Sequence, residues 1–202
     1  KLQAHSSSGY YGTSYTTDQY SLTQTFTAGN ASSFESESNN TVSTADALTL
    51  GNPIKGGLSS RTFDQAGNVV GDVDYYKFTT SSSGSVSITL DSPLVATPFD
   101  GFSFTLYDSN NNNLGLYKLE TGTDLTASLG IPSAGTYYVK LQASAYGKHT
   151  SDQYSLTTSF TAGNASSFES EPNDSKTTAD SISSGDAIKG QLSSSTFDYD
   201  GN

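Results

Sequence analysis

The residues best suited to chemistry form one short acidic run. Its donor groups are the carboxylates of Glu35 and Glu37 and the side-chain amides of Asn39 and Asn40. Calcium takes six to eight oxygen ligands from such groups, and extracellular modules bind it with dissociation constants of ~10⁻⁴ to 10⁻³ M. This spacing favours a calcium site. The alternative is a solvated linker in which the same side chains only face water.

No catalytic centre is recognisable in the chain. Cys is absent, neither the Gly-x-Ser-x-Gly motif nor the His-Glu-x-x-His motif occurs, and His5 and His149 lie where the copies described below are least alike. We therefore expect no enzyme activity. The formal net charge of −11 argues against a nucleic-acid partner, which needs clustered Lys and Arg. No apolar stretch approaches ~18 residues, so we expect no membrane span.

The acidic run belongs to a long internal repeat. Residues 18–68 return as residues 152–202, displaced by 134 positions, and 34 of the 51 aligned positions are identical. Such similarity is typical of a tandem-repeat protein, and 134 residues is an ordinary size for one domain. We divide the chain into the C-terminal part of one copy (1–34), a complete copy (35–168) and the N-terminal part of a third (169–202). We expect the natural protein to continue at both ends.

The elements that must position these residues are strands. Apolar and polar residues alternate strictly over much of the complete copy, which is typical of half-buried strands. The pattern predicts about eight strands, at 54–58, 74–78, 85–90, 102–107, 114–119, 125–129, 137–142 and 154–156. Only Thr44–Leu50 suggests a turn or two of helix. Strands without intervening helices predict an all-β sandwich or barrel.

The order of motifs in the complete copy resembles the bacterial pre-peptidase C-terminal domain. The matching pieces are the acidic run 35–40, Thr44-Ala45, Gly51, Ile54-Lys-Gly56 with Leu58-Ser59, Asp72-Val-Asp74-Tyr-Tyr-Lys-Phe78, Leu106-Tyr-Asp108, Ala134-Gly-Thr-Tyr-Tyr-Val139 and Tyr154-Ser-Leu156. The resemblance implies a jelly-roll-like β-sandwich, repeated in large secreted or surface proteins. It also implies kinship with the calcium-dependent collagen-binding modules of collagenases.

The same resemblance implies a set of calcium ligands in each copy. In the complete copy it places Asp72 and Asp74, at the entry of a strand, opposite the acidic run. The third copy offers the equivalent set Glu169, Glu171, Asn173 and Asp174. Asn40 is neutral where Asp174 is charged, so we expect the complete copy to bind calcium more weakly.

Three hypotheses about function follow, and none is catalytic. The first is a spacer module of a bacterial extracellular tandem-repeat adhesin or filament, stiffened by calcium at its interdomain joints. The second is an accessory module of a secreted hydrolase that binds collagen, a peptide or a glycan, for example through exposed tyrosines such as Tyr107, Tyr117 and Tyr138. The third is self-assembly through open strand edges. The expected partners are therefore neighbouring repeats, further copies of the chain, or an extracellular protein or glycan.

Overall fold

The fold is a sandwich of two β-sheets. The computed structural model describes residues 21–26, 31–58, 62–63, 69–70, 72–93, 101–143 and 152–192, so His5 and His149 lie outside the described residues. The strands are β1 (Asp46–Ala47), β2 (Pro53–Gly56), β3 (Thr62–Phe63), β4 (Val69–Val70), β5 (Val73–Thr80), β6 (Gly84–Asp91), β7 (Phe102–Tyr107), β8 (Asn113–Leu119), β9 (Asp124–Ile131), β10 (Gly135–Ala143) and β11 (Tyr154–Ala162). Three short 3-10 helices accompany them: η1 (Ala31–Ser33), η2 (Val42–Thr44) and η3 (Ala165–Ser167).

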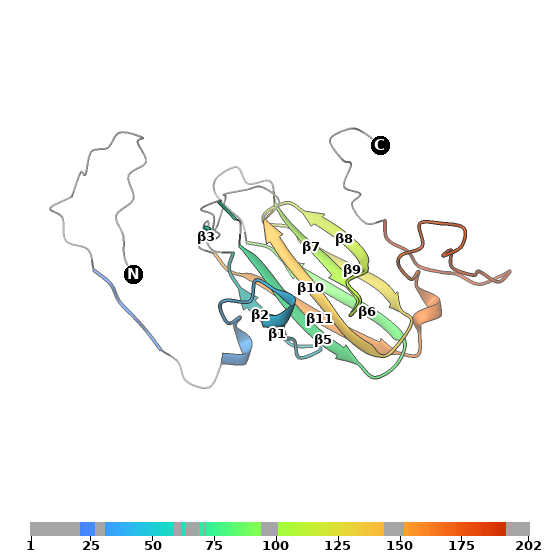
Figure 1. Ribbon diagram of the computed structural model, residues 1–202, viewed down its shortest axis with the longest axis horizontal. Coiled ribbons are helices and arrows are strands. Elements are labelled where there is room, and N and C mark those ends of the chain that lie inside the picture. Colours follow the sequence, from blue (N-terminus) through green and yellow to red (C-terminus); the bar gives the residue numbers. More distant parts are fainter. Residues whose placement is uncertain are drawn as a thin grey trace.

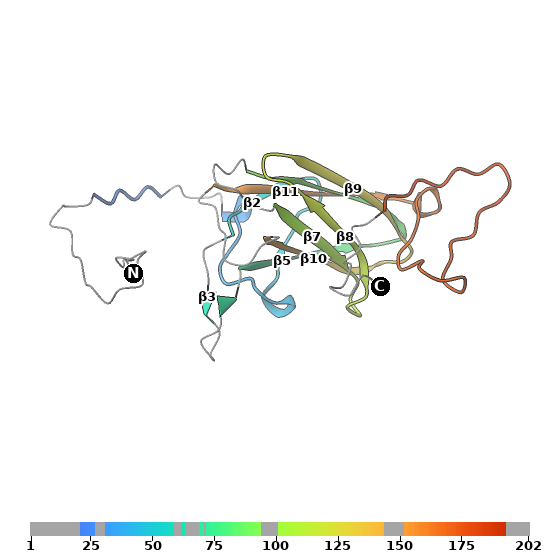
Figure 2. The ribbon, with the colours of Figure 1, turned by 90° about the horizontal axis from the view of Figure 1, so that it is seen from above.

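Each layer of the sandwich mixes strands from distant parts of the chain. One sheet has the order β1-β5-β10-β7-β8 and the other the order β2-β11-β6-β9, while β3 and β4 form a separate hairpin. The two layers are separated clearly when the molecule is viewed from above (Figure 2). The pairings are antiparallel except for β1, which runs parallel to β5. No described helix is long or apolar enough to cross a membrane.

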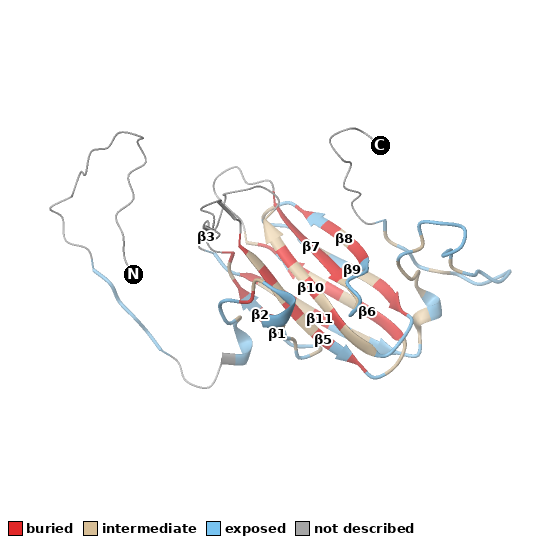
Figure 3. Ribbon diagram, in the orientation of Figure 1, coloured by how far each residue is buried: buried red, intermediate tan, exposed pale blue. Residues whose placement is uncertain are grey.

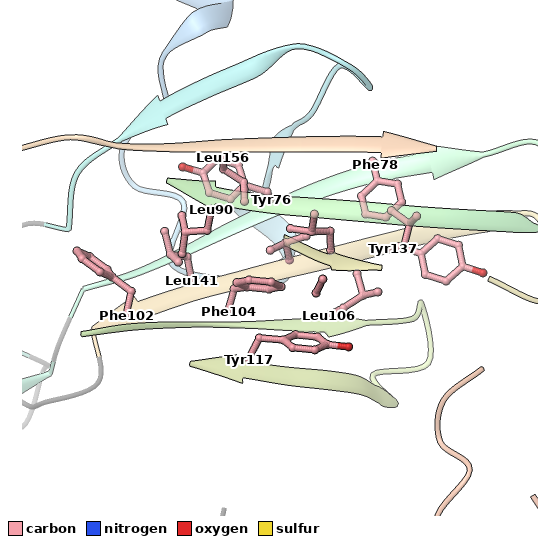
Figure 4. Close-up of a cluster of buried hydrophobic side chains, with 14 of the residues drawn as sticks. Tyr76, Phe78, Leu90, Phe102, Phe104, Leu106, Tyr117, Tyr137, Leu141 and Leu156 are labelled. Atoms are coloured by element: carbon pink, nitrogen blue, oxygen red, sulfur yellow. The ribbon is translucent and has the colours of Figure 1, made fainter. Parts of the chain in front are cut away.

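Alternating side chains from both sheets fill the core. Burial switches from residue to residue along β5 and β11, as the banding of Figure 3 shows. Large aromatic and aliphatic side chains meet between the layers (Figure 4). The Phe104 and Tyr117 rings lie 5.1 Å apart, and the Phe78 and Tyr137 rings stack at 5.6 Å. Because this interior has the size of a domain core, the complete copy does not depend on disulfides for stability.

The predicted sandwich is confirmed, and each of the eight predicted strands overlaps an observed strand. Two expectations were wrong. Thr44–Leu50 is not helical: η2 ends at Thr44, and Leu48 donates its amide to Lys77 in β5 at 2.8 Å, so the segment bonds to the sheet instead of to itself. Tyr117 is not exposed, because its ring packs on Phe104 inside the core. The division into copies at 34 and 168 stays a prediction.

Candidate metal site

The opening segment of the complete copy fixes Glu35 against the second sheet. Phe34 forms a parallel β-bridge with Lys55, and Glu35 donates its amide to the Lys55 carbonyl at 2.9 Å. The amide of Gly57 then donates to Glu35 Oε1 at 2.6 Å. Hydrogen bonds therefore fix both the main chain and the side chain of Glu35, so its carboxylate has a defined position.

Asp74 reaches the same place from the other sheet. Alternation along β5 sends Asp74 to the buried face, on the same side as Tyr76 and Phe78. The hydroxyls of Tyr76 and Tyr154 each donate to Glu35 Oε2 at 2.9 Å, and the Tyr154 hydroxyl also bonds to Asp74 Oδ2. The two tyrosines thereby link the Glu35 and Asp74 carboxylates, which come from different layers of the sandwich.

Glu37 completes a group of three carboxylates. One oxygen each of Glu35, Glu37 and Asp74 lies within 4.8 Å of the other two. Burial raises the pKa of Asp74 to about 9, and the charge of Glu35 adds to this effect. Burial also raises the pKa of Glu37, with further contributions from the charges of Asp72 and Glu35. The raised pKa keeps Asp74 protonated at neutral pH when no cation is present, and a bound cation would displace that proton and stabilise the carboxylate.

Two buried oxygens in this region have no hydrogen-bond donor. Asn39 is fully buried. Its side-chain amide nitrogen donates to Asp46 at 3.4 Å, and its main-chain carbonyl accepts the Tyr75 amide at 3.0 Å. Its Oδ1 has no partner, and neither has Oδ1 of Asp74. Buried polar atoms are nearly always satisfied, so two orphaned oxygens beside a carboxylate cluster fit a bound cation. All donors are oxygens, which suits calcium better than zinc.

Asn40 and Asp72 lie beside this group and interact with each other. In the orientation that satisfies its neighbours, the Asn40 amide nitrogen donates to Asp72 Oδ1 at 3.3 Å and to the Val73 carbonyl at 3.0 Å. Asp72 is buried and also accepts the Val73 amide at 3.1 Å. Asn40 therefore serves as a hydrogen-bond donor that holds Asp72 at the entry of β5.

The third copy repeats the local fold of the opening segment without assembling the cluster. Glu169 donates its amide to Lys189 at 2.9 Å, and its carboxylate accepts the Gln191 amide, as Glu35 does with Lys55 and Gly57. Glu171 Oε2 accepts the Asn173 amide at 2.9 Å, while Asp174 is exposed. Among the described residues, no third carboxylate joins Glu169 and Glu171. The repeat positions of Asp72 and Asp74 fall after residue 202.

Sequence reasoning missed four residues that shape this region. From sequence, Tyr76 and Tyr154 are ordinary strand residues, because alternation cannot show that their hydroxyls meet two carboxylates. Ser36 donates its amide and hydroxyl to Asp46 at 2.7 and 2.6 Å, which orients the loop between them. A signal for this pair existed, because Ser170 and Asp180 recur at the same offset and make the same two bonds. The recurrence shows that this loop conformation belongs to the repeated part of the sequence.

Comparison with known families supports the resemblance inferred from the motifs. Residues 72–143 match the bacterial pre-peptidase C-terminal domain, which confirms that resemblance for the stretch from the entry of β5 to the end of β10. The match includes Asp72 and Asp74 but not the acidic run at 35–40. No relative was found among curated proteins.

Solved structures with a similar arrangement are distant in sequence. The pre-peptidase C-terminal domain of a collagenase from Bacillus anthracis is 20% identical, with a TM-score of 0.40 over 56% of this chain and 93% of that one. The CBM35 of Abf62 from Cellvibrio japonicus is 17% identical, with a TM-score of 0.32 over 56% of this chain and 99% of that one.

Proposed function

We propose that this chain is a spacer segment of an extracellular tandem array, such as a bacterial surface adhesin or filament, with a calcium ion at the opening of each copy. The observation that carries the proposal is the position of two equivalent 3-10 helices. The helices η1 and η3 have the same sequence in consecutive copies, and they lie at opposite ends of the sandwich (Figure 1). A module entered at one end and left at the other adds length with each copy.

Calcium suits this role because of where its ligands come from. Glu35, Glu37 and Asn39 belong to the opening segment, while Asp72 and Asp74 belong to the entry of β5. Bound calcium would neutralise the mutual repulsion of these carboxylates and tie the opening segment to the sheet. In the array, the same would hold for Glu169 and Glu171 of the next copy, so each joint would stiffen.

Calcium binding is tested by thermal unfolding of the full chain in calcium and in excess chelator. With free calcium at 100 times the dissociation constant, linkage gives about 2.7 kcal/mol of stabilisation per site. The Asp124→Asn variant is a matched control, because Asp124 is exposed at the start of β9 and far in sequence from the acidic run. Superimposable unfolding curves for the unsubstituted chain in the two buffers would remove calcium from the proposal.

The spacer geometry is tested by a distance measurement between the two ends. Ser33 and Ser167 occupy the same place in consecutive copies, both are exposed, and the chain has no Cys of its own. Spin labels on Ser33→Cys and Ser167→Cys should therefore give one narrow distance distribution. A broad distribution, or one centred at short distance, would contradict a module that holds its ends apart.

One surface favours a second candidate function, that of a ligand-binding accessory module. On the outward face of the five-stranded sheet, Lys77 lies opposite Tyr138 and Tyr75 lies opposite Lys140. Tyr107 continues the first row beside Tyr138. Within strands β5, β7, β8 and β10, no described outward position carries a carboxylate. Tyrosine rings and ammonium groups together suit a glycan or peptide ligand.

Binding assays decide between the two functions. The full chain would be titrated against soluble collagen peptides and against neutral and acidic oligosaccharides. Micromolar binding that is lost in the double variant Lys77→Gln and Lys140→Gln would make the accessory role the main one. Lys118→Gln is the control, because Lys118 lies on the same sheet but pairs with Ser103.

A further inference from the structure

Strand β9 has an outward residue that is buried. Along this strand Ala127, Leu129 and Ile131 face the core, so Thr126, Ser128 and Gly130 occupy the outward positions. Thr126 is exposed and Ser128 half-buried, as expected at such positions, but Gly130 is buried. Because β9 is the last strand of its sheet, something outside the sheet must cover its free edge at this point.

The cover is the segment that leads into the next copy. The Gly130 amide donates to the Glu169 carbonyl at 2.7 Å, a bond that satisfies an edge group the sheet itself leaves open. Just before this, the Gly163 amide donates to the Ser83 carbonyl at 3.0 Å, which guides the chain from the end of β11 around the sheet. The helix η3 follows and lies against β9 (Figure 1).

The fit at Gly130 leaves no space for a side chain. A Cβ atom added there would lie 2.9 Å from the carbonyl oxygens of Ala165 and Glu169 and 3.1 Å from that of Phe168. All three are main-chain atoms, so a rotamer change cannot relieve the contact. Gly130 does not have a positive φ, so its backbone does not require glycine. The glycine is required by the segment that lies over it.

Two further contacts extend this surface. Pro132 lines a groove of about 220 Å³ together with Ala165, Phe168 and Ile188. Burial raises the pKa of Tyr117 in the neighbouring β8 to about 12, with contributions from the charges of Glu169 and Glu171. Glu169 and Glu171 therefore lie near enough to β8 for their charges to act on Tyr117, and β8 and β9 are the edge strands of the two sheets.

We propose that the free edge of β9 is a docking site for the segment that leads into the following repeat, so that consecutive repeats meet in a fixed joint. We call the contact of Gly130 and Pro132 with Ala165–Glu169 the Gly130 joint. The occupant is identified by sequence, because residues 163–169 are identical to residues 29–35, which lead from the preceding copy into the complete one. The proposal rests on the proposed function only in treating the copies as consecutive modules.

The joint has a consequence for the complete copy itself. Ala31–Glu35 form the same short helix and the same bridge to a lysine as Ala165–Glu169. Phe34 is 38% exposed in this chain, whereas Phe168 is half-buried, with the Lys189 ammonium 5.7 Å from its ring centre. The segment that leads into each copy thus carries the face that packs on the preceding sandwich, and the relative orientation of neighbours is set by their sequence.

Amide hydrogen exchange followed by NMR tests the joint in the full 202-residue chain. In the unsubstituted protein, the Gly130 amide should be protected, although Thr126, at another outward position of the same strand, is exposed to solvent. In the Gly130→Ala variant, exchange at residues 163–169 should rise at least ten-fold while β6 and β10 stay protected. Gly135→Ala is the matched control, because a Cβ there meets nothing closer than 3.8 Å, and it should leave residues 163–169 unchanged.

The outcomes separate the joint from the other proposals. All samples contain excess chelator, so failure of calcium binding does not affect this result. Unchanged exchange at residues 163–169 in Gly130→Ala would overturn the joint. If Gly130→Ala loses protection throughout the sandwich, the exchange rate of the Gly130 amide in the unsubstituted protein is the deciding measurement. Exchange as fast as in an open loop overturns the proposal. A protected amide supports it.

Discussion

At the scale of single residues, Asp74 is a buried carboxyl group whose surroundings fit a bound cation. Its carboxylate accepts a hydrogen bond from Tyr154 but faces Glu35 and Glu37, and one of its oxygens has no donor. Buried carboxylates that lack a cation cost stability, whereas a cation turns the same group into a ligand. If calcium binds as proposed, Asp74 stabilises the chain only when the ion is present.

The substitution Asp74→Asn separates these two effects. Asparagine keeps the volume and still accepts from Tyr154, but it cannot supply a charged carboxylate to a cation. We expect the variant to be as stable as the unsubstituted chain, or more stable, in chelator, and to lose most of the calcium-dependent gain of about 2.7 kcal/mol at saturating calcium. Calorimetry in both buffers measures this. A variant that keeps the whole calcium-dependent gain would exclude Asp74 as a ligand.

Asp108 gives a prediction that is independent of metal. Although burial acts to raise its pKa, hydrogen bonds from Asn112 and Asn110 outweigh this and hold the pKa below its usual value of 3.8. A lowered folded-state pKa stabilises the protein above the unfolded-state pKa, and this contribution is lost as the pH falls through the folded value. Asp108→Ala should therefore cost roughly 0.5–1.5 kcal/mol at pH 7 and distinctly less near pH 2. Urea unfolding at the two pH values is the measurement, and equal losses at both would contradict it.

At the scale of elements, the pairing of β2 with β11 depends on a glycine. Gly56 lies opposite Tyr154, and any side chain at Gly56 would collide with the Tyr154 hydroxyl and the Glu35 carboxylate. Gly56→Ala should destabilise the chain by roughly 1–3 kcal/mol, the usual cost of overpacking. The adjacent Gly57→Ala is the control, because nothing lies within 4 Å of a Cβ there. Chemical unfolding compares the two, and an equal effect would show that Gly56 has no special constraint.

The strands were predictable because their alternation is local, whereas the partners of each strand are not. Val86, Ile88 and Leu90 identify β6 from sequence alone, but nothing in them shows that β11 and β9 lie on either side. Strand β1 was missed for a related reason. Two residues are too few to show an alternation of apolar and polar side chains, and Asp46–Ala47 is a strand only because it pairs with β5.

The same distinction applies to the candidate site, where residues close together in sequence were predictable and contacts between distant residues were not. Glu35, Glu37 and Asn39 were recognisable from donor type and spacing within one short segment. Asp72 and Asp74 came from a resemblance, and the structure places Asp74 with Glu35 and Glu37. Tyr76 and Tyr154 could not be foreseen, since their role depends on contacts across 41 and 119 positions of sequence. Gly130 could not be recognised for the same reason, because its constraint comes from the segment that leads into the next copy.

At the scale of the whole molecule, the described segments before and after the sandwich relate differently to it. Residues 21–26 are exposed throughout, with Leu22 at 74% and Phe26 at 83%. Residues 163–169, by contrast, bond to Ser83 and Gly130 and cover the edge of β9. The segment that follows β11 therefore covers one edge of the sandwich. In the proposed array this segment leads into the following copy, so each copy would depend on the neighbour on that side.

Two shortened chains test this directional dependence. Removal of residues 1–30 should change the free energy of unfolding by no more than ~0.5 kcal/mol, as surface changes usually do. Removal of residues 163–202 deletes two main-chain hydrogen bonds and the cover of Gly130, and should cost roughly 1–3 kcal/mol. At about 4 °C for each kcal/mol, the Tm falls visibly only in the second chain.

The second shortened chain should also associate, because the uncovered edge of β9 offers unpaired main-chain groups to another copy. Light scattering against concentration follows this, with the chain lacking residues 1–30 as the control. Equal melting temperatures and equal scattering for the two shortened chains would show that each sandwich is complete in itself. A lower Tm and association in the second chain alone would mean that consecutive copies protect one another, so an array is more stable and less prone to aggregation than its separate modules.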